Sequence, residues 1–220
     1  MLRFLQMEEN KLSERIPTWI GERMSSLIVL SLRSNKFHGN IGLQICLLVH
    51  IQLLDLSNNN ISGTIPRCLN NLTAMAHKVS NYLDNSYIIW NGTVFRLIDI
   101  LTPTKAGESL TTIVGWKGNV YEYGKNFGEM RNIDLANNKL TGKIPEEISS
   151  LIKLKALNLL RNMLTGMIPQ NFGQLEQLES LDLSRNRFSG PLPACMAALH
   201  YLGFLNLSYN EFSGRIPTST

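Results

Sequence analysis

Residues 154–169 read LKALNLLRNMLTGMIP, and residues 178–193 repeat the same pattern as LESLDLSRNRFSGPLP. Both stretches place three leucines at fixed positions before an asparagine, and a glycine and a proline at fixed positions after it. The two asparagines, Asn162 and Asn186, are 24 residues apart. A repeat of this length predicts a solenoid, because one unit cannot bury its leucines alone and must stack on its neighbours.

The same asparagine recurs seven times along the 220 residues. Its occurrences are Asn10, Asn35, Asn59, Asn138, Asn162, Asn186 and Asn210. The successive spacings are 25, 24, 79, 24, 24 and 24 residues, and the outlier equals one 24-residue period plus 55 residues. The repeat units are therefore 2–26, 27–50, 51–74, 130–153, 154–177, 178–201 and an incomplete 202–220. We expect three parts: repeats at 1–74, an insertion at 75–129, and repeats at 130–220.

Each fixed position has a physical reason. The L-x-L segment alternates with period two, which predicts a short strand with its leucines inward, and such strands stack in parallel roughly 4.8 Å apart. The asparagine amide can pair with buried backbone groups of its own turn and of the next coil, so the repeat predicts an asparagine ladder. The glycine allows a turn with positive φ, and the proline can start a short helical segment. The first unit has Glu14 at the glycine position, and the second has Gly42 at the proline position.

The L-x-G-x-I-P ending of a 24-residue unit resembles the plant-specific leucine-rich repeat. The resemblance covers the whole chain except the insertion. It implies an α/β solenoid, a right-handed superhelix with parallel strands on its concave face and short helical or 3-10 turns on its convex face. It also implies a second short strand near the G-x-I-P segment.

An insertion followed by four final repeats is similar to the ectodomains of plant receptor-like proteins, where it is called an island domain. The segment from Trp116 to Tyr123 and the segment from Arg131 to Pro145 resemble the island end and the next repeat of the Cf-type disease-resistance group. The resemblance implies a recognition module on the extracellular face of the plasma membrane. It implies a peptide, protein or elicitor ligand and signalling through co-receptor kinases. The chain shows neither a signal peptide pattern nor a membrane-spanning segment, so we expect the membrane anchor of such a receptor to lie outside it.

Two other readings remain open. The chain resembles, more distantly, the ectodomain of a brassinosteroid-receptor type of kinase, in which the island forms a pocket for a small steroid. Soluble inhibitors of fungal polygalacturonase also use plant-type repeats, although they lack an island, so residues 75–129 argue against that reading.

The sequence predicts neither an enzyme nor a cofactor or metal site. The four histidines, at positions 38, 50, 77 and 200, are scattered and form no H-E-x-x-H pattern. The net charge of +4 is mild, and no basic block along the sequence indicates a nucleic-acid partner.

The concave face is the expected binding surface, because solenoids bind through it. The repeat phase predicts that its exposed positions include Arg131, Asn132, Asp134, Lys155, Asn158, Arg161, Glu179, Asp182, Arg185, Asn206 and Tyr209. Arginines at one phase on adjacent coils can hold a carboxylate or sulfate, although ordinary solvated charge is the alternative. The insertion aromatics can clamp a ligand or form a small core of their own. The predicted ligand-binding residues are Trp116, Lys117, Tyr121, Tyr123, Arg131, Lys155, Arg161, Arg185 and Tyr209.

Cysteines and glycosylation motifs complete the candidates. Stacking brings Cys46 and Cys68 about one coil apart, so they form either a disulfide or two buried thiols, whereas Cys195 has no evident partner. Four N-x-S/T motifs are candidate glycosylation sites, of which the second and third are the favoured acceptors: Asn60, Asn71, Asn91 and Asn206.

Overall fold

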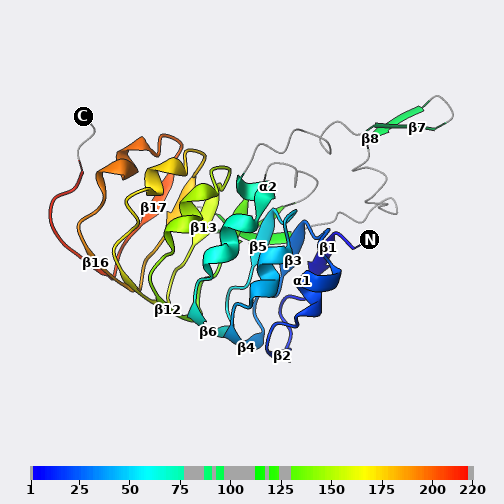
Figure 1. Ribbon diagram of the computed structural model, residues 1–220, viewed down its shortest axis with the longest axis horizontal. Coiled ribbons are helices and arrows are strands. Elements are labelled where there is room, and N and C mark those ends of the chain that lie inside the picture. Colours follow the sequence, from blue (N-terminus) through cyan, green and yellow to red (C-terminus); the bar gives the residue numbers. More distant parts are fainter. Residues whose placement is uncertain are drawn as a thin grey trace.

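The structure is a computed structural model that describes residues 2–76, 87–90, 93–96, 112–116, 119–123 and 130–217. Seven short strands form one parallel sheet, the main sheet, along the whole stack of coils (Figure 1). In spatial order they are β1 (Phe4–Gln6), β3 (Val29–Ser31), β5 (Leu53–Asp55), β11 (Asn132–Asp134), β13 (Ala156–Asn158), β15 (Ser180–Asp182) and β17 (Phe204–Asn206). Each strand is the L-x-L segment of one repeat unit, so the alternation of the sequence is the alternation of the sheet.

A second parallel sheet, the second sheet, runs along the lower edge of the stack in Figure 1. Its strands are β2 (Ser13–Glu14), β4 (Lys36–Asn40), β6 (Asn60–Thr64), β12 (Lys139–Gly142), β14 (Met163–Gly166), β16 (Arg187–Gly190) and β18 (Glu211–Phe212). Each lies just after a ladder asparagine, where the repeat resemblance implied an additional strand. Two parallel sheets joined by short turns confirm the predicted leucine-rich-repeat solenoid.

Short helical segments connect the second sheet back to the main sheet. They are α1 (Trp19–Arg23), η1 (Leu43–Leu47), η2 (Arg67–Asn71), α2 (Thr73–Ala76), η4 (Glu146–Ser150), η5 (Phe172–Gln174) and η6 (Ala194–Ala198). Pro66, Pro145 and Pro193 each stand immediately before a 3-10 segment with extended backbone angles. The proline therefore fixes where the chain turns from strand into helical segment. No helix of the described residues is long and apolar enough to cross a membrane.

The stack continues directly across the predicted insertion. β5 pairs with β11 in register, with Leu54 beside Ile133, and β6 pairs with β12 in the same parallel sense. Between these partners the chain contains two antiparallel strand pairs, β7 (Tyr87–Trp90) with β8 (Thr93–Arg96) and β9 (Thr112–Trp116) with β10 (Asn119–Tyr123). The solenoid thus closes as though the third and fourth units were consecutive.

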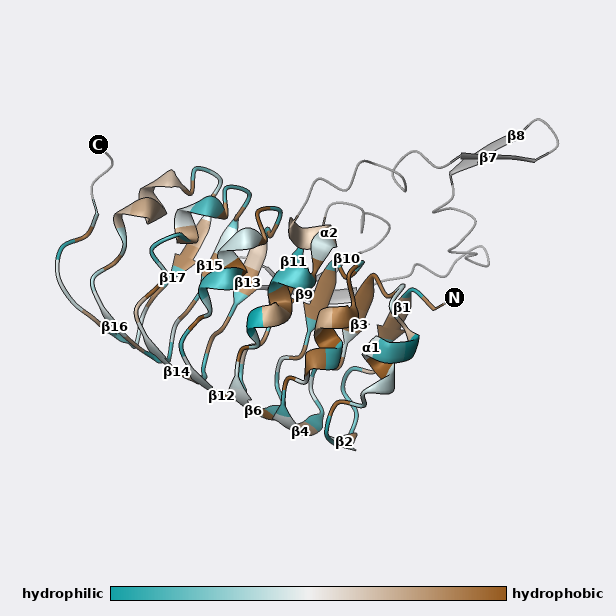
Figure 2. Ribbon diagram, in the orientation of Figure 1, coloured by the Kyte–Doolittle hydropathy of each residue, from teal (hydrophilic) through white to brown (hydrophobic). Residues whose placement is uncertain are grey.

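The core lies between the two sheets and the helical turns. The inward leucines of successive strands are almost completely buried, and Phe172 and Phe188 are its largest fully buried side chains. Figure 2 shows the same separation, with hydrophobic residues in the inner strands and hydrophilic ones concentrated in the outer turns. One contiguous core built from equivalent positions explains the unchanging 24-residue spacing, because a shifted unit would expose its leucines.

The ladder asparagines use their amides at every coil after the first. Asn162 Nδ2 donates to the carbonyl oxygens of Leu135, Leu159 and Leu160, and its Oδ1 accepts from the Leu140 N–H at 3.0 Å. Leu135 and Leu140 belong to the preceding coil. The predicted contact with the next coil is therefore wrong in direction, because the turn of each coil is bonded by the asparagine of the coil after it.

The ladder also crosses the join between the third and fourth units. Asn138 Nδ2 donates to the Leu56 carbonyl at 2.9 Å, and Asn138 Oδ1 accepts from the Ile61 N–H at 3.0 Å. Asn10, in the first coil, donates only to carbonyls of its own turn. The pattern shows that the amide joins each coil to the one before it.

We predict that Asn162→Ala lowers the free energy of unfolding by about 3 kcal/mol, because several buried backbone groups lose their partner. The matched control is Asn60→Ala, since Asn60 is exposed in β6. Urea unfolding monitored by circular dichroism checks the difference. Equal stability of the two variants would contradict a structural role for the amide.

The glycine phase offers a second test. Six glycines at this phase have φ between 76° and 86°, and Glu14 adopts a φ of 82° at the same phase. A side chain in this left-handed region is strained, so Glu14→Gly should raise the free energy of unfolding by about 1 kcal/mol. The converse change, Gly166→Ala, should destabilise, since its added Cβ would lie 2.9 Å from Lys143 Cγ. Thermal unfolding of both variants measures the two signs.

Candidate ligand-binding face

The outward side of the main sheet, called here the main-sheet face, carries two rows of side chains, one at the first and one at the third position of each strand. The first row is Phe4, Val29, Leu53, Asn132, Ala156, Ser180 and Phe204. The second row is Gln6, Ser31, Asp55, Asp134, Asn158, Asp182 and Asn206. The first row is mostly apolar toward its N-terminal end, and the second is polar and acidic.

Two predicted surface positions on this face are wrong. Asn132 is only 3% exposed and Asp182 only 8% exposed. Asn132 lies beside the buried cluster of Ile28, Val29, Leu53 and Met130, and its amide has no hydrogen-bond partner. Repeat phase states which way a side chain points, but it does not state how crowded that side is.

The second row is bonded along the stack. Asn158 Nδ2 donates to Asp134 Oδ2 at 3.0 Å, and Asn206 Nδ2 donates to Asp182 Oδ2 at 3.3 Å. Asp182 also accepts from the Ser184 hydroxyl at 2.6 Å, as Asp55 does from that of Ser57. An amide therefore separates one carboxyl from the next along this row, except between Asp55 and Asp134.

Asp55 and Asp134 lie directly beside each other on β5 and β11. Burial raises the pKa of Asp55 from its usual 3.8 to about 6, although hydrogen bonds from Ser57 oppose the shift. Burial and the neighbouring Asp55 carboxyl raise the pKa of Asp134 to about 8, against the lowering effect of Asn158 and Arg33. At neutral pH this carboxyl pair consequently holds a proton. The sequence gave no signal for it, because the two residues are 79 positions apart.

A third row, the turn row, presents the residue just before each ladder asparagine. Its members all have a positive φ between 51° and 55°: Glu9, Ser34, Asn58, Asn137, Arg161, Arg185 and Tyr209. Asn137 Nδ2 donates to Asn58 Oδ1 at 2.8 Å across the join between the third and fourth units. The Arg185 guanidinium carbon lies 4.4 Å from the centre of the Tyr209 ring, within cation–π distance. Arg161, Arg185 and Tyr209 are all exposed, so this part of the row faces solvent.

Two other predicted ligand-binding residues are engaged within the protein. Arg131 donates from Nε to the Ala74 carbonyl at 2.8 Å and from Nη1 to the Met130 carbonyl at 2.7 Å. It therefore ties α2 to the start of the fourth unit. Lys155 pairs with Glu179 on the next coil, with Nζ 3.4 Å from Oε1.

The remaining predicted ligand residues belong to the insertion. Trp116 lies in β9, and Tyr121 and Tyr123 lie in β10, where Tyr121 is the register partner of Val114. Lys117 lies outside the described residues. The structure therefore places three of these four residues on one strand pair.

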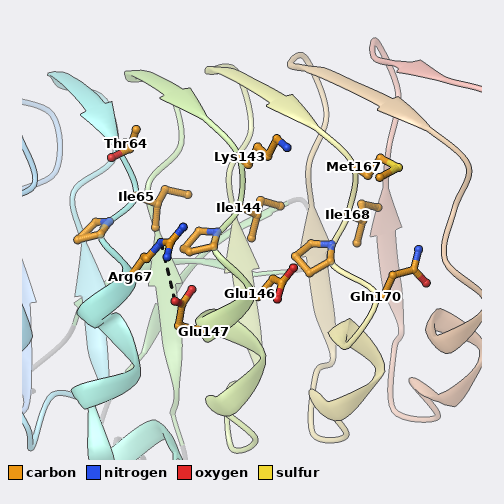
Figure 3. A pocket seen from close by; sticks show the side chains of 13 residues that line it. Thr64, Ile65, Arg67, Lys143, Ile144, Glu146, Glu147, Met167, Ile168 and Gln170 are labelled. Atoms are coloured by element: carbon orange, nitrogen blue, oxygen red, sulfur yellow. Dashed lines mark ion pairs between the residues drawn. The ribbon is translucent and has the colours of Figure 1, made fainter.

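A shallow groove of about 780 Å³ lies where the third, fourth and fifth coils leave the second sheet, and sequence reasoning did not anticipate it. It is lined by prolines and by both signs of charge, including Lys143 and Glu146. Figure 3 shows Arg67 and Glu147 pointing toward each other across it, and their Nε and Oε1 atoms are 3.8 Å apart. Because this ion pair is exposed, it leaves the groove open to solvent. The described residues include no cluster of His, Cys, Asp or Glu that could hold a metal ion.

Cys46 and Cys68 form a disulfide between the adjacent segments η1 and η2, with their Cα atoms 5.7 Å apart. Cys195 is a free, half-buried thiol. Its sulfur accepts from the Gly173 N–H at 3.3 Å.

The four glycosylation motifs occupy different surroundings. Asn60 and Asn71 are exposed, and Asn71 ends η2 on the helical side. The Asn206 side chain is bonded to Asp182 and Ser208, and Asn91 lies outside the described residues. The first two motifs are therefore the accessible ones among those that the structure describes.

Comparison with known proteins agrees with this architecture. Models of the leucine-rich-repeat family match residues 128–188, 153–212 and 50–72. Receptor-like protein EIX2 of Solanum lycopersicum is 42% identical over 167 residues, a match that covers 71% of this chain and 14% of that protein. The chain therefore spans only a small part of the length of this relative.

Solved structures show the same coil geometry. The ectodomain of the Arabidopsis thaliana membrane receptor kinase GASSHO1/SCHENGEN3, solved with CASPARIAN STRIP INTEGRITY FACTOR 2, superposes with a TM-score of 0.72 at 28% identity, covering 98% of this chain and 19% of that one. Arabidopsis HAESA, solved with the peptide hormone IDA and the co-receptor SERK1, gives a TM-score of 0.58 at 30% identity, covering 96% of this chain and 30% of that one.

Two parallel sheets, an asparagine at every turn and a 24-residue period define a leucine-rich-repeat protein. Together with the curated relatives, they place the chain among the plant leucine-rich-repeat receptor-like proteins.

The Asp55–Asp134 pair predicts how stability depends on pH. Both folded-state pKa values lie above the unfolded value of 3.8, so the folded protein holds protons that the unfolded chain has released. The free energy of unfolding should therefore fall as the pH rises from about 4 toward 8. Asp134→Asn should flatten this dependence and stabilise the protein at the alkaline end, whereas Glu211→Gln, which removes an exposed carboxylate, should leave it unchanged. Urea titrations across that range measure the slopes, and identical slopes for wild type and Asp134→Asn would contradict the assignment.

Proposed function

We propose that the chain is the ligand-recognition module of a plant cell-surface receptor-like protein. The exposed Arg161–Arg185–Tyr209 part of the turn row carries this proposal. Two guanidinium groups at one phase of adjacent coils stand about 4.8 Å apart at their backbones, a spacing that lets both contact one carboxylate. Their exposure leaves these groups accessible to a partner.

The ligand that fits this row is a peptide or a protein segment with an acidic side chain or a free C-terminus. Tyr209 holds Arg185 against its ring, which limits the rotamers of the arginine before binding and reduces the entropy lost on binding. The backbone of the turn row is also fixed, since every member shares the same left-handed conformation and precedes a ladder asparagine. Preorganised cations of this kind favour a defined anion over general charge attraction.

The remaining parts of the proposal follow from the relatives. The HAESA structure contains a peptide hormone and a co-receptor, and the GASSHO1/SCHENGEN3 ectodomain is also seen with its factor. By analogy, this module recognises its ligand outside the cell, and ligand binding promotes association with a co-receptor kinase. Trp116, Tyr121 and Tyr123 of the insertion contribute contact area to the same ligand, and Asn60 and Asn71 carry glycans. Recognition requires no catalytic residue, metal or cofactor.

The test is a binding screen of the purified 220-residue chain against synthetic peptides with free or amidated C-termini. We expect selected peptides to depend on a carboxylate, and Arg161→Ser combined with Arg185→Ser to weaken binding by about 100-fold. The control, Arg23→Ser with Lys153→Ser, removes the same charge from other surfaces and should retain binding. Undiminished binding by the arginine variant would move the ligand site away from the turn row.

A further inference from the structure

The second sheet has an outward face of its own, called here the second-sheet face. It is formed by the residues one, three and five positions after each ladder asparagine. Along β4, for example, Lys36 and His38 are exposed while Phe37 between them is buried in the core. The face lies along the lower edge of Figure 1, on different strands from the main-sheet face.

Positive charge gathers on this face. Its cations are all exposed: Lys11, Arg15, Lys36, Lys139, Lys143, Arg187 and Arg215. Within the described part of the chain none of these seven is in an ion pair. Glu211 is the one acidic residue at these outward positions, and Glu14 lies beside them at a turn. Charges that are scattered in the sequence therefore form a continuous basic surface in the fold.

The cations are also regularly spaced. Lys36, Lys139 and Arg187 occupy the same phase on the second, fourth and sixth coils. Coils are about 4.8 Å apart, so these three side chains recur about every 10 Å. This distance is close to the length of two linked pyranose rings in an extended sugar chain.

A row of hydroxyl groups runs beside the cations, at the position three residues after each asparagine. It consists of Ser13, Ser62, Thr141, Thr165, Ser189 and Ser213, with His38 in the second coil. The strand register places Lys36 beside Ser13, Lys139 beside Ser62 and Arg187 beside Thr165. Each of these cations consequently has a hydrogen-bonding hydroxyl on the adjacent strand.

We propose that the second-sheet face binds a linear polyuronic acid, an acidic polysaccharide with one carboxylate on each sugar. In an extended chain of this kind, alternate carboxylates point to the same side, which matches cations on alternate coils. The protein hydroxyls and the sugar hydroxyls can hydrogen-bond along the same line.

Other polyanions fit this face less well. Single-stranded nucleic acid is held by stacking of its bases on aromatic side chains, and no outward position on this face is aromatic. A membrane surface would require apolar side chains that insert between lipids, whereas the large apolar residues here are only Met163 and Met167. The proposed site goes beyond the recognition function, because it uses a different sheet and leaves the turn row free.

The experiment measures binding of the 220-residue chain to polygalacturonate by calorimetry at low and at physiological salt. We expect binding that weakens with salt, and no binding to the fully methyl-esterified polymer, which keeps the sugars but lacks the charge. Lys139→Ser combined with Arg187→Ser should reduce the affinity about tenfold. The control is again Arg23→Ser with Lys153→Ser, which lowers the net charge equally on other surfaces. Circular dichroism establishes that both variants are folded.

Three results would overturn the proposal. One is an equal loss of affinity in both double variants, since that would make net charge alone responsible. Another is unchanged binding to the esterified polymer. The third is binding of anionic phospholipid vesicles or single-stranded DNA that is at least as tight as binding of polygalacturonate and is lost in the Lys139/Arg187 variant. Peptide binding at the turn row is measured separately, so failure of one proposal leaves the other testable.

Discussion

The pairing of one asparagine amide with backbone groups of two coils is the interaction on which this molecule depends. At each turn after the first, the amide donates to carbonyls of its own coil and of the preceding coil, and its oxygen accepts an N–H from the preceding coil. These backbone groups sit where the chain leaves the main sheet, so they are beyond the reach of the strand ladder. Without the amide they would be buried and unpaired, which is more costly than an average hydrogen bond is favourable. The leucine core supplies most of the driving force, but the amide fixes which coil stands above which.

Fixed coil register turns sequence phase into surface chemistry. Any residue type that recurs at one phase becomes a row along the solenoid, whatever its distance in sequence. The acidic residues Asp55, Asp134 and Asp182 therefore lie on one sheet, and seven lysines and arginines lie on the other. The net charge of +4 conceals this separation, because it averages over two faces of opposite character.

The solenoid, its period and its leucine core could be predicted from the sequence, because a single unit already contains the strand, the turn and the core positions. The cysteine pair was also open to prediction, since the phases of Cys46 and Cys68 differ by only two positions. Crowding was not, and Asn132 is buried because its neighbours across the strands are apolar. The stacking of Arg185 on Tyr209 was equally hidden, because it depends on the left-handed backbone of the turn row. Phase thus predicts direction, while partners require the third dimension.

The join between β5 and β11 also affects the order in which the protein folds. Every other pair of adjacent coils is connected by about 24 residues of chain, but this pair is separated by 79 residues between ladder asparagines. Bringing the ends of the longer segment together costs about 1 kcal/mol more in chain entropy. Coils on either side of the join can therefore nucleate on their own neighbours before the two halves meet. The join is then the last long-range contact to form and the first to open, which makes it the mechanical weak point of an otherwise uniform spring.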